Sequence, residues 1–155
     1  MEYILAQKND LKIVFDIVQK TIKSIYPKYY PQEVVKFFCE LHSLENIEKD
    51  ICDGSVGLLK DGEHFVGTGC YKENYITRVY VLPEFQGKGY GTYIMNCLEE
   101  KIAEIHNKAY LDASLPASQL YEKRGYVTIE HRKWEVDNGV ILVYEVMEKE
   151  LFNSK

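Results

Sequence analysis

The sequence lacks the features that would assign it to several common protein classes. Its four cysteines form no CxxC pair and its four histidines are scattered, whereas structural zinc sites bring their ligands in short-spaced pairs. No apolar run is long enough to span a bilayer, the longest being residues 140–143. The first ten residues, which include Glu2 and Asp10, do not have the basic and then apolar order of a secretory signal. We therefore expect no metal, no membrane partner and a cytoplasmic location.

Positive charge is also scarce. The chain has 19 Lys and Arg against 24 Asp and Glu, a formal net charge of −5, whereas nucleic-acid binding needs a clustered basic surplus. We therefore expect no nucleic-acid partner. The 155 residues, 46% hydrophobic and 28% charged, have a globular composition that suffices for one core. No linker or repeat interrupts residues 1–155, so we expect a single domain, with its cysteines as free and mostly buried thiols.

Helical periodicity dominates the first third of the chain. Apolar residues recur at helical spacing over residues 10–26, with Lys and Gln on the other face. Pro27 and Pro31 interrupt this pattern, and Pro31 suits the first turn of a second helix. Ser43 is placed to cap a third helix, whose inward-facing residues would be Leu44, Ile47 and Ile51.

Strand patterns begin at residue 55, with an Asp61-Gly62 turn typical of a hairpin. A later helix over 89–106 would place Ile94, Leu98, Ile102 and Ile105 on one side. The predicted strands are 56–59, 64–70, 75–82 and 109–113, followed by a short helix over 116–124 and two closing strands around residues 137–139. This order predicts an α+β (mixed α/β) fold, in which helices cover a mixed sheet.

The densest functional signal is a glycine-rich loop between a strand and a helix. Gln86, Gly89 and Gly91 have the spacing Gln-x-x-Gly-x-Gly, with Gly87 and Lys88 between them. Glycine admits positive φ and close approach of a ligand, and amides at a helix N-terminus suit phosphate oxygens. Neither the P-loop spacing nor the dinucleotide fingerprint GxGxxG is present, which argues against a nucleotide-binding protein. Taken alone, such a loop is better interpreted as a glycine-rich turn that binds no ligand.

Two motifs in the right order point to a known family. The strand end at Val79, Val81 and Pro83, together with the glycine loop, resembles the acyl-CoA-binding motif of the GNAT superfamily of N-acetyltransferases. A second segment is similar to the helix that carries the family's frequent catalytic Tyr, through Ala117, Leu120, Tyr121, Glu122, Lys123, Gly125 and Tyr126. The resemblance covers nearly the whole chain, and it implies a GNAT-like mixed, mostly antiparallel central sheet flanked by helices.

The resemblance also implies where acetyl-CoA would bind. The main chain of Val79 and Val81 would pair with the pantetheine arm as an added strand does. The amide of Val81 would donate to the thioester oxygen, as an oxyanion-hole donor. The residues implied for cofactor binding are Val79, Val81, Gln86, Gly87, Lys88, Gly89, Tyr90, Gly91 and Thr92.

The implied proton donor to the leaving thiolate is Tyr121, whose alternative role is packing against the sheet. Many family members carry a Glu base at the position that aligns with Tyr75, and a phenol is protonated at neutral pH. Spacing does not distinguish the substitutes, so we assign no base; they are Glu73, His42, Glu33 and His131.

We therefore predict an N-acetyltransferase in which a primary amine attacks acetyl-CoA directly in a ternary complex. The alternative is a non-catalytic acyl-CoA-binding or sensing module of the same fold. A relay through Cys70 or Cys97 is disfavoured, because neither thiol has a neighbouring His or Lys in sequence.

The acceptor is predicted to be a small-molecule or peptide amine. The acidic balance leans toward polyamines, amino sugars or peptide amines, and aromatic residues in the N-terminal helices and last strands would shape its pocket. These residues are Tyr26, Tyr29, Tyr30, Phe37, Phe38, Trp134 and Tyr144, with packing preferred for Phe37 and Phe38. An exposed edge in the last strands would allow pairing into a homodimer.

Overall fold

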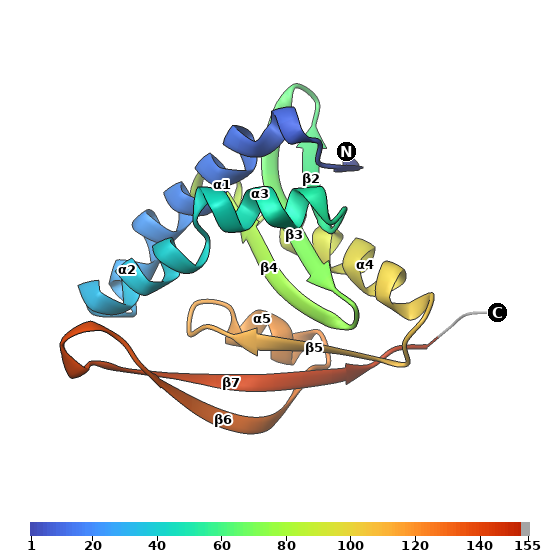
Figure 1. Cartoon of the computed structure of the whole chain (residues 1–155). Coiled ribbons are helices and arrows are strands. Elements are labelled where there is room, and N and C mark those ends of the chain that lie inside the picture. The colour runs from blue at the N-terminus through green and yellow to red at the C-terminus, as the bar shows by residue number, and fades with distance from the viewer. Residues whose placement is uncertain (153–155) are drawn as a thin grey trace.

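A seven-stranded sheet runs through the centre of the computed structural model, which describes residues 1–152 (Figure 1). The strand order is β1-β2-β3-β4-β5-β7-β6, and only the β4–β5 pair is parallel. The sheet is therefore mixed and mostly antiparallel, as predicted. The strands are β1 (Glu2–Leu5), β2 (Val56–Asp61), β3 (His64–Lys72), β4 (Tyr75–Val81), β5 (Lys108–Ala113), β6 (Val127–Glu135) and β7 (Ile141–Glu150).

Helices cover both faces of the β1–β4 part of the sheet. One core cluster joins Val14, Val18 and Ile22 to β2 and β3, and the other packs Ile94 and Leu98 against β3 to β5. The helices are α1 (Leu11–Ile25), α2 (Gln32–Leu41), α3 (Leu44–Cys52), α4 (Tyr90–Ala103) and α5 (Ser118–Lys123).

Local sequence signals account for most of these boundaries. The Ser43 hydroxyl caps α3 by accepting from the Asn46 amide at 3.1 Å. Pro31 sits at the N-cap of α2, and Gly62, at φ +62°, turns the β2–β3 hairpin. These confirm the predicted starts of the second and third helices and the predicted hairpin.

The first strand was missed in the sequence. β1 has four residues, and its pairing partners, such as Gly57 for Leu5, lie more than fifty positions away in the chain. The Tyr3 ring lies directly over Gly57. A Cβ added at Gly57 would fall 2.1 Å from the Cζ of Tyr3. Pairing of this kind depends on tertiary contact rather than on a local pattern, so periodicity does not detect it.

Several predicted burials are also wrong. The long helix ends at Ala103, and Ile105, beyond its end, is 82% exposed. Leu44 points outward from α3. Gln19, expected on the polar face of α1, is buried because its amide donates to the carbonyls of Cys39 and His42 at 2.9 Å each, where α2 ends.

The cysteines are free, as expected, but only Cys70 is buried. Cys52 is exposed, and Cys39 and Cys97 are half-buried. The expectation of mostly buried thiols is therefore wrong, because the helices that carry these three residues lie on the surface of the sheet.

Candidate functional site

The site lies where the sheet divides between its two parallel strands. The Cα partners of β4 and β5 are only Tyr75 with Tyr110 and Ile76 with Leu111. Beyond these pairs β4 continues to Val81 and β5 to Ala113, but the two strands no longer pair with each other. Figure 1 shows them diverging. The divergence leaves one edge of β4 open in the middle of the sheet.

A register shift in β4 determines which side chains face this opening. Cys70 of β3 is opposite Arg78, whereas Tyr71 is opposite Ile76, so Thr77 is the extra residue of a bulge. The bulge brings Tyr75 and Arg78 to the same cavity, and Ile76 both borders this cavity and packs in the core under α4.

The open edge of β4 presents main-chain groups at Val79 and Val81. The Leu82 amide donates to the Val66 carbonyl of β3 at 2.9 Å. Successive amides of a strand point to opposite edges. Because the Leu82 amide points to β3, the amides of Val81 and Val79 point away from β3, to the open edge. The Val81 carbonyl on that edge accepts from Gln86 Nε2 at 2.9 Å. The two amides thus remain available to an extended ligand.

The predicted glycine loop opens α4 beside this edge. Gly87 and Gly89 have φ of +80° and +86°, and a Cβ at either position would meet no atom within 4 Å. The space in front of the loop is therefore free, and the first amides of α4 face it. This geometry fits a pyrophosphate group, to which the Lys88 ammonium, 5.6 Å from the Phe85 ring centroid, would add positive charge.

The other loop residues divide between exposed and packed positions. Thr92 is exposed in the first turn of α4. The Tyr90 hydroxyl donates to Asp61, so this side chain is anchored to β2. A Cβ at Gly91 would lie 3.7 Å from Leu120 Cδ2, which makes Gly91 the contact between α4 and α5.

A cavity of about 600 Å³ extends from the open edge toward α2 and α3. Its lining includes Val79 but not Val81, and it includes Tyr121. Among the predicted aromatic residues, Tyr29 is absent from the lining and Tyr30 belongs to a second cavity of about 280 Å³. The predicted aromatic residues that do line the first cavity are Tyr26, Phe37, Phe38, Trp134 and Tyr144.

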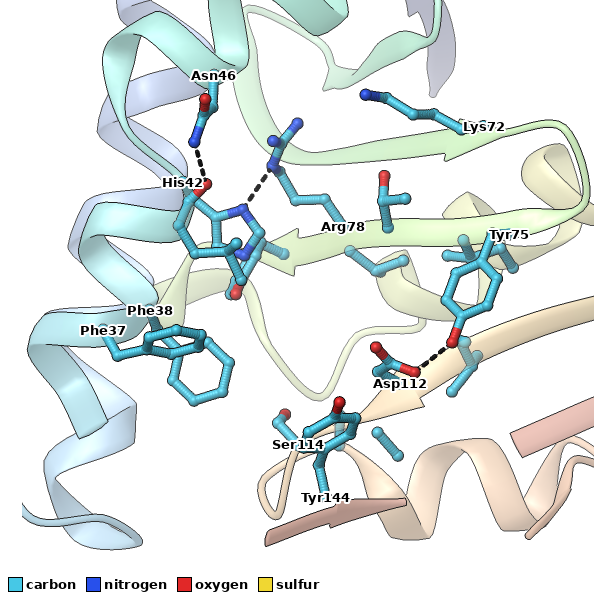
Figure 2. Close-up of a pocket in the computed structure, with 18 of the residues that line it drawn as sticks. Phe37, Phe38, His42, Asn46, Lys72, Tyr75, Arg78, Asp112, Ser114 and Tyr144 are labelled. Atoms are coloured by element: carbon cyan, nitrogen blue, oxygen red, sulfur yellow. Dashed lines mark hydrogen bonds between the residues drawn. The ribbon is translucent and has the colours of Figure 1, made fainter. Parts of the chain in front are cut away.

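Phe37 and Phe38 have different surroundings. Phe38 packs edge-on against Tyr26, with ring centroids 4.9 Å apart, and belongs to the core around α1. Packing was therefore the right interpretation for Phe38, which also borders the cavity. Phe37 contacts the Phe38 ring and forms part of the cavity wall (Figure 2).

Tyr121 is buried in α5, at 7% exposure, and reaches the cavity. Burial, and then the nearby Tyr26, raises the pKa of the Tyr121 phenol well above its usual value. The hydroxyl is therefore protonated at neutral pH and can act as a proton donor.

The four predicted substitutes for a base are dispersed. His131 borders the second cavity, and Glu33 and Glu73 line neither cavity. His42 does line the first cavity, but its Nδ1 accepts from Arg78 Nε at 3.1 Å (Figure 2). Burial, and then the Arg78 cation, lower the pKa of His42 to about 3. This ring is neutral at pH 7, and the lone pair of its Nδ1 already accepts the hydrogen bond from Arg78.

Sequence reasoning missed Asp112, which lies on β5 at the point where the strands diverge. Its carboxylate accepts a hydrogen bond from Tyr75, and both residues line the cavity (Figure 2). Burial, and then this hydrogen bond, raise the pKa of Tyr75. One feature of the sequence could have identified Asp112: it is the single charged residue within the predicted buried strand 109–113.

Asp50 and Arg78 form a second polar group along the cavity. Arg78 Nη2 lies 2.9 Å from Asp50, and Lys72 Nζ also lies 2.9 Å from that carboxylate. Asp50 is thus shared by two cations.

The two cysteines considered for a relay lie away from these groups. Cys70 is fully buried, with its sulfur 3.6 Å from the Ser55 hydroxyl. Burial, and then Glu100, raise the pKa of the Cys97 thiol. Neither residue lines the cavity.

Two further features bear on ligand class. Within residues 1–152, no three His, Cys, Asp or Glu side chains gather in a way that would hold a metal ion. None of the helices described here combines the length and apolar content needed to cross a membrane.

Comparison with known proteins adds a family and several similar folds. A model of the acetyltransferase (GNAT) domain matches residues 25–151. A search of curated protein sequences gives no match.

Solved structures share the fold at low sequence identity. A GCN5-related N-acetyltransferase from Rhodopseudomonas palustris has a TM-score of 0.88 at 22% identity, over 97% of this chain and 95% of the other. The PaiA N-acetyltransferase of Thermoplasma acidophilum, in complex with coenzyme A, has a TM-score of 0.74 at 17% identity, over 96% and 98%. A ribosomal-protein-alanine N-acetyltransferase from Brucella melitensis has a TM-score of 0.70 at 20% identity, over 97% and 100%.

Proposed function

Because the chain belongs to the GNAT acetyltransferase family, we propose that it transfers the acetyl group of acetyl-CoA to a primary amine. One arrangement carries this proposal: the open edge of β4 connects the glycine loop to a cavity that contains Tyr121. A phosphate-binding loop, an extended slot and a buried proton donor are the parts that transfer from a CoA thioester requires.

The slot and the loop would hold the two ends of the cofactor. The amides of Val79 and Val81 would pair with the pantetheine arm, in the manner of strand addition. The amides of residues 86–92 would receive the pyrophosphate, which the open space at Gly87 and Gly89 admits. Acetyl-CoA supplies an activated acetyl thioester to this site.

One main-chain amide would stabilise the charge that develops on the thioester oxygen. A single preorganised donor of this kind contributes about 3 kcal/mol. The sequence assigned it to Val81, but Val79 is the one that borders the cavity with Tyr121. We therefore assign this contact to the Val79 amide and the pantetheine contact to Val81.

Tyr121 would donate its proton to the sulfur as the C–S bond breaks. Its high pKa keeps the proton on the phenol until negative charge develops on the sulfur. General acid assistance of this kind contributes about 10²–10⁴-fold. Direct attack by the amine is favoured over a cysteine relay, because neither Cys70 nor Cys97 borders the cavity.

Calorimetric titration with acetyl-CoA tests the cofactor part of the proposal. Gly89→Glu would fill the open space with a negative charge and should abolish binding. Gly54→Glu is the matched control, because Gly54 also has positive φ and open surroundings but lies between α3 and β2. Absence of binding by the native protein would refute the proposed function.

The alternative is a protein of this fold that binds acyl-CoA as a sensor. It is favoured by one observation, the Tyr75 phenol where many relatives carry a Glu base. An assay of thiol release with a panel of primary amines separates the two. A transferase releases CoA when an amine is added, whereas a sensor binds acetyl-CoA and shows no release that depends on an amine.

A further inference from the structure

Asp112 is placed where an acceptor must meet the thioester. It follows Leu111, the last residue of β5 that pairs with β4, so its carboxylate stands at the apex of the opening. The side chain is exposed and lines the same cavity as Val79 and Tyr121.

Asp112 differs from the other carboxylate of the cavity in its partners. Asp50 has Arg78 and Lys72 at 2.9 Å each. Asp112 makes no ion pair with any residue that the structure describes. It accepts a hydrogen bond from the neutral phenol of Tyr75. Its negative charge therefore remains available for a cation in the cavity.

The walls around Asp112 suit an apolar group next to that cation. Phe37 and Phe38 face the Tyr75–Asp112 pair across the cavity, and Tyr144 lies beside it (Figure 2). Aromatic rings favour both alkyl groups and ammonium ions. His42, which is neutral, adds no charge to this wall.

The opposite end of the cavity disfavours a second positive charge. Lys49, Lys72 and Arg78 line it, with only Asp50 to balance them. A polyamine would place an ammonium group near this cationic end, where it would be repelled. The acidic net charge of the chain is thus a poor guide to the charge of its cavity.

We propose that Asp112, held by Tyr75, binds the ammonium group of the acceptor, and that the acceptor is a monoamine with an apolar or aromatic group next to its nitrogen. This inference rests on the proposed function and specifies its substrate class.

The same carboxylate accounts for the proton that acetylation releases. The bound ammonium gives one proton to Asp112, which frees the nitrogen lone pair; a C–N bond forms and the C–S bond breaks. The thiolate takes a proton from Tyr121, and the phenolate recovers the second proton that leaves the nitrogen. An alkylammonium is a far weaker acid than a carboxylic acid, so the free amine forms before the attack as a minor species and is drawn off as the C–N bond forms. The exposed Asp112 then returns its proton to water.

Binding of 2-phenylethylammonium, measured by calorimetry on the free protein, tests the ammonium site without requiring turnover. We expect Asp112→Asn, which preserves the shape of the side chain, to weaken binding at least tenfold. Asp61→Asn is the matched control, because Asp61 also accepts from a tyrosine, Tyr90, but lies outside the cavity. It should change the affinity less than twofold.

Two other probes test the substrate class. The neutral 2-phenylethanol should bind at least tenfold more weakly than the ammonium, and spermidine should bind no more tightly than it. Phe37→Ala, which removes part of the wall without altering Asp112, should weaken 2-phenylethylammonium several-fold. Thermal melting of each variant establishes that it is folded.

The inference is overturned if the native protein does not bind 2-phenylethylammonium, if Asp112→Asn binds it equally well, or if spermidine binds more tightly. Acetyl-CoA binding is measured separately. If acetyl-CoA binds and the amine probe does not, only this inference fails; if acetyl-CoA does not bind, the proposed function fails.

Discussion

Two phenols of the cavity illustrate how the surroundings of a residue determine its role. Tyr121 is buried in α5, and its hydroxyl makes no hydrogen bond to another described side chain, so its proton is free for a ligand. Tyr75 donates to Asp112 and holds that carboxylate in place. Both phenols have raised pKa values, yet only Tyr121 has an uncommitted proton.

Replacing Tyr121 with Phe should therefore remove catalysis and little else. We expect the rate of amine-dependent thiol release to fall about 10²–10⁴-fold, with unchanged affinity for acetyl-CoA. Steady-state assays and calorimetry on the same preparations measure the two quantities. A loss of less than threefold would show that Tyr121 only packs against the sheet.

His42 makes the stability of the protein depend on pH. Its pKa is lowered to about 3 in the fold, against about 6.5 in an unfolded chain. Between these values the unfolded state binds more protons, so stability rises with pH there. The contribution of His42 to the free energy of unfolding is complete above pH 6.5 and is lost as pH falls toward 3.

Urea unfolding at a series of pH values measures this dependence. We expect the free energy of unfolding of the native protein to decrease from pH 7 to pH 4. His42→Gln offers Arg78 an oxygen acceptor that does not titrate, so its decrease should be shallower over the same range. Parallel curves for the two proteins would contradict the assignment.

At the scale of elements, close packing of α4 on the sheet sets the position of the glycine loop. A Cβ at Gly67 of β3 would lie 2.8 Å from both Ile94 Cδ1 and the Tyr80 carbonyl oxygen. At Gly91, inside α4, the nearest atom would be 3.7 Å away, an ordinary contact. The helix thus rests directly on the backbone of β3, but has room toward α5.

This difference predicts opposite effects of the same substitution. Gly67→Ala should destabilise the protein by about 1–3 kcal/mol, because overpacking forces the helix or β4 to move. Gly91→Ala should stabilise it by about 0.5–1 kcal/mol, because alanine is the better helix former. Chemical unfolding of both variants measures these changes. Equal effects would mean that α4 does not lie this close to β3.

At the scale of the whole molecule, the open edge of β4 separates two parts of the sheet. Strands β1 to β4 and strands β5 to β7 are paired through only two Cα register positions. A ligand that pairs with β4 in this gap would connect the two parts and would bind only the folded state.

Acetyl-CoA should therefore raise the melting temperature. At a concentration one hundred times its dissociation constant, the stabilisation is about 2.7 kcal/mol. For a chain of this size that corresponds to about 5–10 °C. Differential scanning fluorimetry measures the shift, and Gly89→Glu should show almost none. An equal shift in that variant would locate the ligand away from the glycine loop.

Local chemistry in the sequence determined a large part of this protein. The hairpin at Gly62, the cap at Ser43 and the glycine loop depend on residues close together in the chain, whose backbone preferences act at short range. The two family motifs depend on order and spacing, which a sequence also contains. The fold class could therefore be predicted, whereas the residues assigned to the cofactor stay a prediction.

Only the tertiary structure decided the polar groups of the cavity, where we propose that the acceptor binds. Whether His42 is a base depends on Arg78, thirty-six positions away, and Asp112 became a candidate through Tyr75, thirty-seven positions away. The bulge at Thr77 and the pairing of β1 likewise depend on partner strands. The charge and protonation state of a side chain follow from burial and from neighbours in space, and these arise only when distant segments pack together.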